Sequence, residues 1–114
     1  IHLISFENCQ ITGTGFSTWN QSEKTSFYCN GSKLSDDGFA VACRSFSRMW
    51  NLDIANTDVG NDGVTSLAGQ SPTMLRINNC KIDKTGINWI VENLPIQSLE
   101  LAPSQMTESE VRQL

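Results

Sequence analysis

The chain has 114 residues, of which 39% are hydrophobic and 18% are charged, and its formal net charge is −4 at pH 7. This composition is typical of one globular domain with an adequate core, and no apolar run approaches the roughly 20 residues that a membrane-spanning helix needs. The Lys and Arg residues are scattered rather than gathered into a stripe that could neutralise phosphates, so we expect neither nucleic acid nor membrane as a partner.

One short pattern is repeated five times along the sequence at almost equal intervals. Each copy reads apolar-x-apolar-x-x-small-x-apolar. The small residue falls at Cys9, Ser32, Thr57, Cys80 and Ser104, with steps of 23, 25, 23 and 24 residues. A period of this length predicts a chain built from stacked structural repeats, each of which buries its core against its neighbours.

Each copy starts with two apolar residues that flank one polar residue. The pairs are Ile4/Phe6, Phe27/Cys29, Leu52/Ile54, Leu75/Ile77 and Leu99/Leu101. Alternation with a period of two predicts a short strand with one buried face. A further inward residue follows each strand, at Ile11, Leu34, Val59, Ile82 and Met106. We therefore predict five strands that lie side by side.

A short helix is predicted after each strand. The position after the last inward residue always holds a favoured N-cap type, namely Thr12, Ser35, Gly60, Asp83 and Thr107. Apolar residues follow at the spacing of a buried helix stripe, at Phe16, Trp19, Phe39, Ala42, Val64, Leu67, Ile87, Ile90, Val111 and Leu114. Glycine recurs in the first turn, at Gly15, Gly38, Gly63 and Gly86. Because glycine costs about 1 kcal/mol relative to alanine in a helix, we predict that these helices pack too close to the strand layer to allow a side chain.

The predicted fold class is therefore α/β, with a parallel sheet on a concave face and short helices on a convex face. The pattern resembles leucine-rich repeats of the ribonuclease-inhibitor-like class. The segment Val59-Gly60-x-x-Gly63-Val64-x-x-Leu67-Ala68 is similar to the GALA-type repeats of bacterial effectors. The resemblance implies a leucine-rich-repeat solenoid of about five repeats. We expect residues 1–114 to be one such domain and a fragment of a longer chain.

The cysteines favour a reducing compartment. Cys9 and Cys80 hold the same repeat position three repeats apart, so they lie about 14 Å apart if neighbouring strands are about 4.8 Å apart. That distance exceeds the roughly 7 Å Cα separation that a disulfide can span. Cys29 and Cys43 fall at inward positions. We predict four buried, reduced thiols and a cytoplasmic protein, located in the host cytosol if the chain belongs to a secreted effector.

The outward strand positions form the candidate binding site. The central row is Ser5, Tyr28, Asp53, Arg76 and Glu100, which predicts an alternating charge ladder beside a tyrosine. The ladder is either a recognition strip, since Tyr and Arg are common interface anchors, or a surface network that satisfies only itself. The predicted partner-binding residues are Tyr28, Trp50, Asn51, Asp53, Met74, Arg76 and Glu100.

Trp50 and Trp89 occupy repeat positions that are mostly polar in the other copies. Each tryptophan either packs laterally against a neighbouring repeat or waits for a partner. We weigh the lateral-packing interpretation slightly higher, since tryptophan is usually largely buried.

The sequence favours binding over catalysis. Its one histidine, His2, is not accompanied by a nucleophile motif. The oxygen-bearing side chains in Asn56-x-Asp58-x-x-x-Asp62-Gly63 lack the spacing of a calcium loop. We expect no cofactor, no metal and a protein partner on the concave face. The alternative is a structural spacer in a longer horseshoe. We also expect the strand Leu3–Glu7 to be an open edge that either self-associates or is covered by residues outside this sequence.

Overall fold

The computed structural model describes residues 2–6, 8 and 24–101. Its strands are β1 (His2–Ser5), β2 (Thr25–Tyr28), β3 (Met49–Asp53), β4 (Met74–Arg76) and β5 (Ser98–Glu100). Its helices are α1 (Asp36–Ser45), α2 (Asn61–Val64), which continues into the 3-10 turn η2 (Thr65–Leu67), and α3 (Lys84–Asn93). The predicted first and fifth helices lie outside the described residues.

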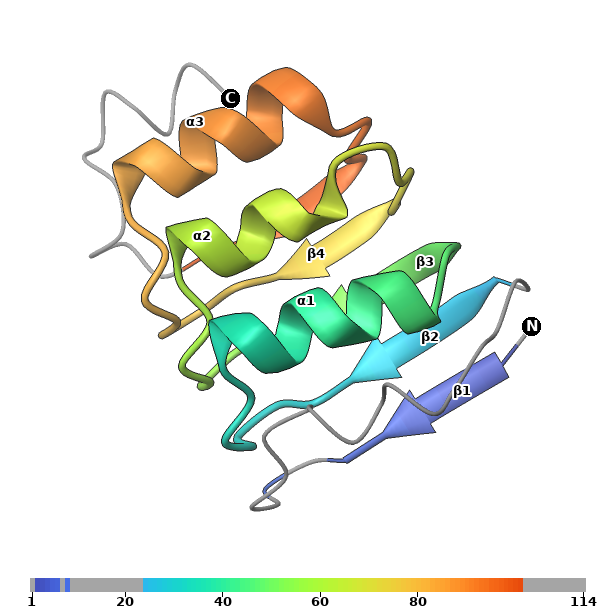
Figure 1. The fold of residues 1–114 in the computed structure, drawn as a ribbon. Helices are drawn as coiled ribbons and strands as arrows, with labels where there is room; N and C mark the ends of the chain where they lie inside the picture. Colours follow the sequence, from blue (N-terminus) through green and yellow to red (C-terminus); the bar gives the residue numbers. More distant parts are fainter. Residues whose placement is uncertain (1, 7, 9–23, 102–114) are drawn as a thin grey trace.

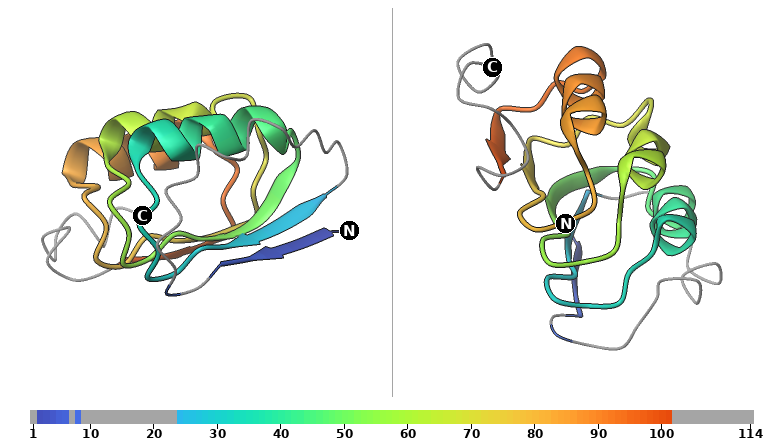
Figure 2. Two further views of the ribbon diagram at one scale, coloured as in Figure 1. Left: turned by 60° about the horizontal axis from the view of Figure 1, so that its bottom comes forward. Right: turned by 90° about the vertical axis from the view of Figure 1, so that its left-hand side faces the viewer.

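The strands form one parallel sheet in the order β1-β2-β3-β4-β5, and the helices lie side by side on one face of it (Figures 1 and 2). The predicted α/β class is therefore confirmed. The opposite face of the sheet carries no helix in the described part of the chain, and we call it the open face. β1 and β5 are the outer strands of the described sheet, and β1 is bounded by His2 and Ser5 rather than by the predicted Leu3 and Glu7.

The strand register matches the repeat alignment. The five residues of the predicted central row are paired directly across neighbouring strands: Ser5, Tyr28, Asp53, Arg76 and Glu100. Their neighbours Phe27, Leu52 and Leu75 are fully buried on the helix side. Since successive side chains of a strand point to opposite faces, the central row lies on the open face.

The core lies between the sheet and the helices. Phe27 from β2 contacts Phe39 of α1 and Phe46, with ring centroids 6.5 and 5.9 Å away. The predicted inward helix residues that the structure describes are all fully buried: Phe39, Ala42, Val64, Leu67, Ile87 and Ile90. The spacing of apolar residues thus identifies the buried stripe of each described helix correctly.

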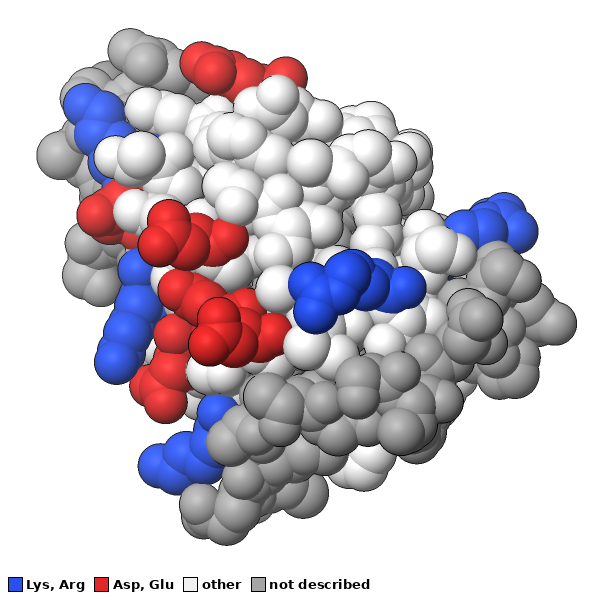
Figure 3. Space-filling view, in the orientation of Figure 1, with Lys and Arg blue, Asp and Glu red and all other residues white. Residues whose placement is uncertain are grey.

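The predicted N-cap positions are also confirmed for the three described helices. The Ser35 hydroxyl accepts a hydrogen bond from the Gly38 amide at 3.1 Å, and the Asp83 carboxylate accepts one from the Thr85 amide at 2.9 Å. Gly60 caps α2 without a side chain. Acidic side chains gather where the helices begin (Figure 3). Negative charge is favourable there because it faces the positive end of the helix dipole.

The helix beginnings are joined by hydrogen bonds that the sequence does not predict. The first residues of α1 and α2 each reach the cap of the following helix: Asp36 Oδ1 accepts from the Gly60 amide at 2.6 Å, and Asn61 Oδ1 accepts from the Asp83 amide at 3.0 Å. Asn61 also donates from Nδ2 to the Asp83 carboxylate at 2.7 Å. Hydrogen bonds from Asn61 and the Thr85 amide lower the pKa of Asp83. These contacts tie neighbouring repeats together along the helix layer.

The predicted reason for the recurring glycine is wrong. A Cβ added at Gly63 would lie 2.5 Å from Asp36 Oδ1 of the preceding helix and 2.9 Å from Val59 Cγ1 of its own unit. At Gly86 the obstacles are the corresponding atoms, Asn61 Oδ1 and Ile82 Cγ2. The glycine therefore makes room for the side chain that joins two helix beginnings and for the last inward residue, rather than for the strand layer.

Candidate functional site on the open face

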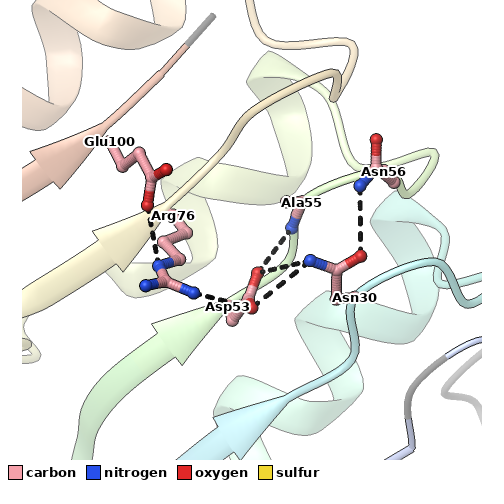
Figure 4. Close-up of polar contacts among 6 residues, drawn as sticks. All are labelled: Asn30, Asp53, Ala55, Asn56, Arg76 and Glu100. Carbon is pink, nitrogen blue, oxygen red and sulfur yellow. Dashed lines mark hydrogen bonds and ion pairs between the residues drawn. The ribbon is translucent and has the colours of Figure 1, made fainter.

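The predicted charge ladder is present on the open face (Figure 4). Arg76 Nε lies 2.7 Å from Glu100 Oε2, and its terminal NH1 lies 3.7 Å from Asp53 Oδ2. The Arg76 and Glu100 side chains are 51% and 53% exposed, whereas the Asp53 side chain is only 7% exposed. The guanidinium thus lies between two carboxylates, while about half of the Arg76 side chain stays accessible.

Asp53 is the buried end of this ladder, and its oxygens have further donors. The Ala55 amide donates to Asp53 Oδ1 at 3.2 Å, and Asn30 Nδ2 lies 3.4 Å from both carboxylate oxygens. A buried carboxylate is tolerated only when it is paired and hydrogen-bonded. Asp53 therefore serves as a fixed acceptor that orients Asn30 and Arg76, rather than as an exposed contact residue.

A row of asparagines extends the polar surface beyond the strand ends. Asn56 Nδ2 donates to Asn30 Oδ1 at 3.1 Å, and Asn79 Nδ2 donates to Asn56 Oδ1 at 3.0 Å. Asn8, Asn56 and Asn79 have φ angles of 55–57°, and Gly31 at the equivalent position has φ 76°. Asn and Gly are the residues that most readily adopt this left-handed conformation. The Asn or Gly that recurs at this position in the sequence is a signal for the turn, but the turn was not predicted.

The other predicted partner-binding residues on the strands lie around the ladder. Tyr28 pairs with Asp53 across β2 and β3, and Asn51 pairs with Met74 across β3 and β4. All three of Tyr28, Asn51 and Met74 are half-buried. Asn51 Oδ1 accepts from the Thr73 hydroxyl at 3.3 Å, whereas the Tyr28 hydroxyl makes no hydrogen bond within the described residues. Tyr28 therefore has a hydroxyl that is free to bond a partner, as far as the described residues show.

The two tryptophans differ in their surroundings. Thr25 pairs with Met49 and Ser26 pairs with Asn51, so Trp50 is an extra residue in β3 opposite β2. Such a bulge redirects a side chain, and Trp50 is half-buried with Lys24 Nζ 5.1 Å from its ring centroid. Trp89 is half-buried on α3 and packs against the core cluster. Trp89 thus packs against the protein's own core, and Trp50 lies apart from the ladder.

Cys29, Cys43 and Cys80 are free, and Cys9 lies outside the described residues. Cys29 is fully buried and Cys43 is 6% exposed, as predicted, but Cys80 is only half-buried. The Cys80 thiol donates to the Ile54 carbonyl at 2.8 Å, which places it at the rim of the core. Burial raises the pKa of Cys80 and raises that of Cys43 to about 12.

We expect Cys43 to resist alkylation in the folded protein at pH 8. The reactive species is the thiolate, and a pKa of about 12 leaves only a trace of it at that pH. Mass spectrometry after iodoacetamide treatment, with and without denaturant, measures this protection. All free cysteines should react in denaturant. A native disulfide that involves Cys29, Cys43 or Cys80 would contradict the repeat register.

Within residues 2–6, 8 and 24–101 no three His, Cys, Asp or Glu side chains are placed to hold a metal ion. None of the described helices is long and apolar enough to cross a bilayer. Comparisons of the chain with protein-family models, with curated proteins and with solved structures find no match.

Proposed function

We propose that the chain is a leucine-rich-repeat module that binds a partner protein through the open face of its sheet. Five parallel strands follow one another in chain order, and equivalent repeat positions are paired across them. This arrangement supports a solenoid of about five repeats, in which a row of side chains from successive repeats forms one continuous surface.

The half-exposed side chain of Arg76 carries the proposal. Asp53 and Glu100 hold it in place, so little side-chain freedom remains to be lost when a partner binds. Tyr28 lies on the same face with an unpaired hydroxyl among the described residues. Tyr and Arg are enriched among residues that dominate binding energy. Asn51 and Met74 extend the proposed surface on the strand-entry side.

The resemblance to GALA-type repeats supports a bacterial effector as the parent protein, with the host cytosol as its place of action. The alternative is a structural spacer within a longer horseshoe. A spacer needs no ordered charged and aromatic strip on its open face, so the fixed position of Arg76 favours the binding module.

Site-specific photo-crosslinking tests the proposed surface. A photo-crosslinking amino acid at Met74 should capture a defined partner in cells, whereas the same amino acid at Glu92, which is exposed on α3, should not. Combining the Met74 probe with Arg76→Gln and Tyr28→Ala should reduce the captured product by at least about tenfold, because hot-spot residues typically contribute 2 kcal/mol or more. Thermal melts confirm that the variants fold. Equal capture from both faces, or capture that these substitutions leave unchanged, would refute an open-face interface and favour the spacer.

A further inference from the structure

A hollow of about 290 Å3 lies where the chain enters β2, β3 and β4 from the preceding loops. Lys24 precedes β2, Arg48 precedes β3, and Gln70 and Ser71 lie in the loop before β4. Trp50 completes this part of the lining. The volume is close to the lower end of the range for small-molecule sites, about 300–1,000 Å3.

The bulge in β3 explains why an aromatic ring reaches this hollow. Trp50 has no counterpart in β2, so its side chain need not follow the regular alternation of side chains between the two faces of the sheet. Its half-buried ring carries the Lys24 ammonium over it at 5.1 Å. A cation over the face of a tryptophan ring is attracted to it electrostatically. This contact keeps one positive charge at the rim of the hollow.

Among the described residues, the charged side chains that line the hollow are all positive. Lys24 and Arg48 are its charged lining residues, and both are exposed. Neither forms an ion pair with any described residue, although the chain as a whole carries a net charge of −4. By contrast, Arg76 and Lys81 are paired with carboxylates. Two unpaired cations beside one ring complement a ligand that combines an anion with a flat apolar group.

The wall of the hollow is fixed by Gln70. Its Oε1 accepts from the Met49 amide at 2.8 Å, and its Nε2 donates to the Cys43 carbonyl at 3.1 Å. These bonds tie the loop before β4 to the start of β3 and to the end of α1. A wall that is already ordered lowers the entropy cost of binding.

We propose that this hollow binds an aromatic phosphate monoester. Arg48 and Lys24 hold the phosphate, which carries up to two negative charges near neutral pH, and the ring of the ligand lies against Trp50. Arg48 supplies the planar fork that matches phosphate geometry, and Lys24 supplies a point charge. The same chemistry occurs on free small molecules and on the phosphotyrosine side chain of a protein. The proposal is independent of the open-face function.

Titration with phenyl phosphate, followed by the NMR signals of the Trp50 indole and the Gly69 and Ser71 amides, tests the site. We expect the shifts to saturate. Arg48→Gln should weaken the affinity for phenyl phosphate by about tenfold, which corresponds to the loss of about 1.4 kcal/mol. Trp50→Leu should weaken binding as well. Lys81→Gln is the matched control, because Lys81 pairs with Asp58 outside this hollow, and it should leave the affinity unchanged.

Three further ligands test the contributions of the negative charge and of the aromatic ring, and the origin of the natural ligand. Benzyltrimethylammonium should not compete, and inorganic phosphate should compete only weakly. A phosphotyrosine peptide that binds at least about tenfold more tightly than phenyl phosphate would assign the hollow to a partner protein, whereas equal affinities would assign it to a free small molecule. The proposal would be overturned by NMR shifts that do not saturate, or by equal shifts on addition of benzyltrimethylammonium. It would also be overturned if Arg48→Gln left the shifts unchanged while melting like the wild type.

Discussion

Replacing Gly63 with leucine is expected to lower the free energy of unfolding by about 3 kcal/mol, at the upper end of the usual cost of overpacking. The new Cβ alone would lie 2.5 Å from Asp36 Oδ1 and 2.9 Å from Val59 Cγ1. Asp36 cannot simply turn away, because that same oxygen accepts the Gly60 amide at 2.6 Å. Relief would require α1 and α2 to separate, which exposes the core between them.

Urea denaturation of the wild type, Gly63→Leu and Asp62→Leu measures this effect. Asp62 is the exposed neighbour in the first turn of α2, so its substitution should cost less than about 1 kcal/mol, the usual contribution of a charge near a helix end. Removing the obstructing carboxylate with Asp36→Ala should make Gly63→Ala cheaper than it is in the wild type. If Gly63→Leu is as mild as Asp62→Leu, the helix beginnings are not packed as the structure shows.

The recurring glycine shows what the sequence could predict and what it could not. The recurrence of glycine at equal spacing identified Gly63 and Gly86 as positions of close approach. A glycine inside a helix lowers stability, so its return in each repeat indicates a packing constraint. The repeat alignment did not identify the obstacle, since the position that supplies it holds Asp36 in one unit, Asn61 in the next and Lys84 after that. A lateral contact between repeats that uses different residue types leaves no periodic pattern.

The same distinction between periodic and non-periodic contacts applies to the residues of the predicted site. Strand pairing fixed the row of Tyr28, Asp53, Arg76 and Glu100, because equivalent positions of a repeat come together whatever their side chains are. The burial of Asp53 was not predicted, since it depends on Asn30 and on the turn at Ala55. The bulge at Trp50 had a signal in the longer step of 25 residues between Ser32 and Thr57, but a step length does not say where the extra residue goes.

The second large effect on the free energy of unfolding is expected at Asp53. Glu100 serves as its control, because both carboxylates contact the guanidinium of Arg76. Distance alone would make Glu100 the more important partner, at 2.7 Å against 3.7 Å for Asp53. Burial predicts the opposite order. Glu100 is 53% exposed, and solvent-exposed ion pairs contribute about 0–1 kcal/mol. We therefore expect Glu100→Ala to change the free energy of unfolding by less than about 1 kcal/mol.

Asp53→Ala is expected to cost about 2 kcal/mol, the usual penalty when buried polar groups lose their partner. It removes the acceptor of the Ala55 amide, which is buried, and that of Asn30 Nδ2, which is half-buried. Asp53→Asn keeps an oxygen that can accept from Ala55, so its cost should fall between those of Asp53→Ala and Glu100→Ala. Urea denaturation of the three variants in low and high salt distinguishes the two effects. The Glu100 effect should shrink in salt because exposed charges are screened, whereas the Asp53 effect should persist. Equal costs for Asp53→Ala and Glu100→Ala would mean that the ladder is a surface network throughout, with no buried anchor to fix Arg76 for a partner.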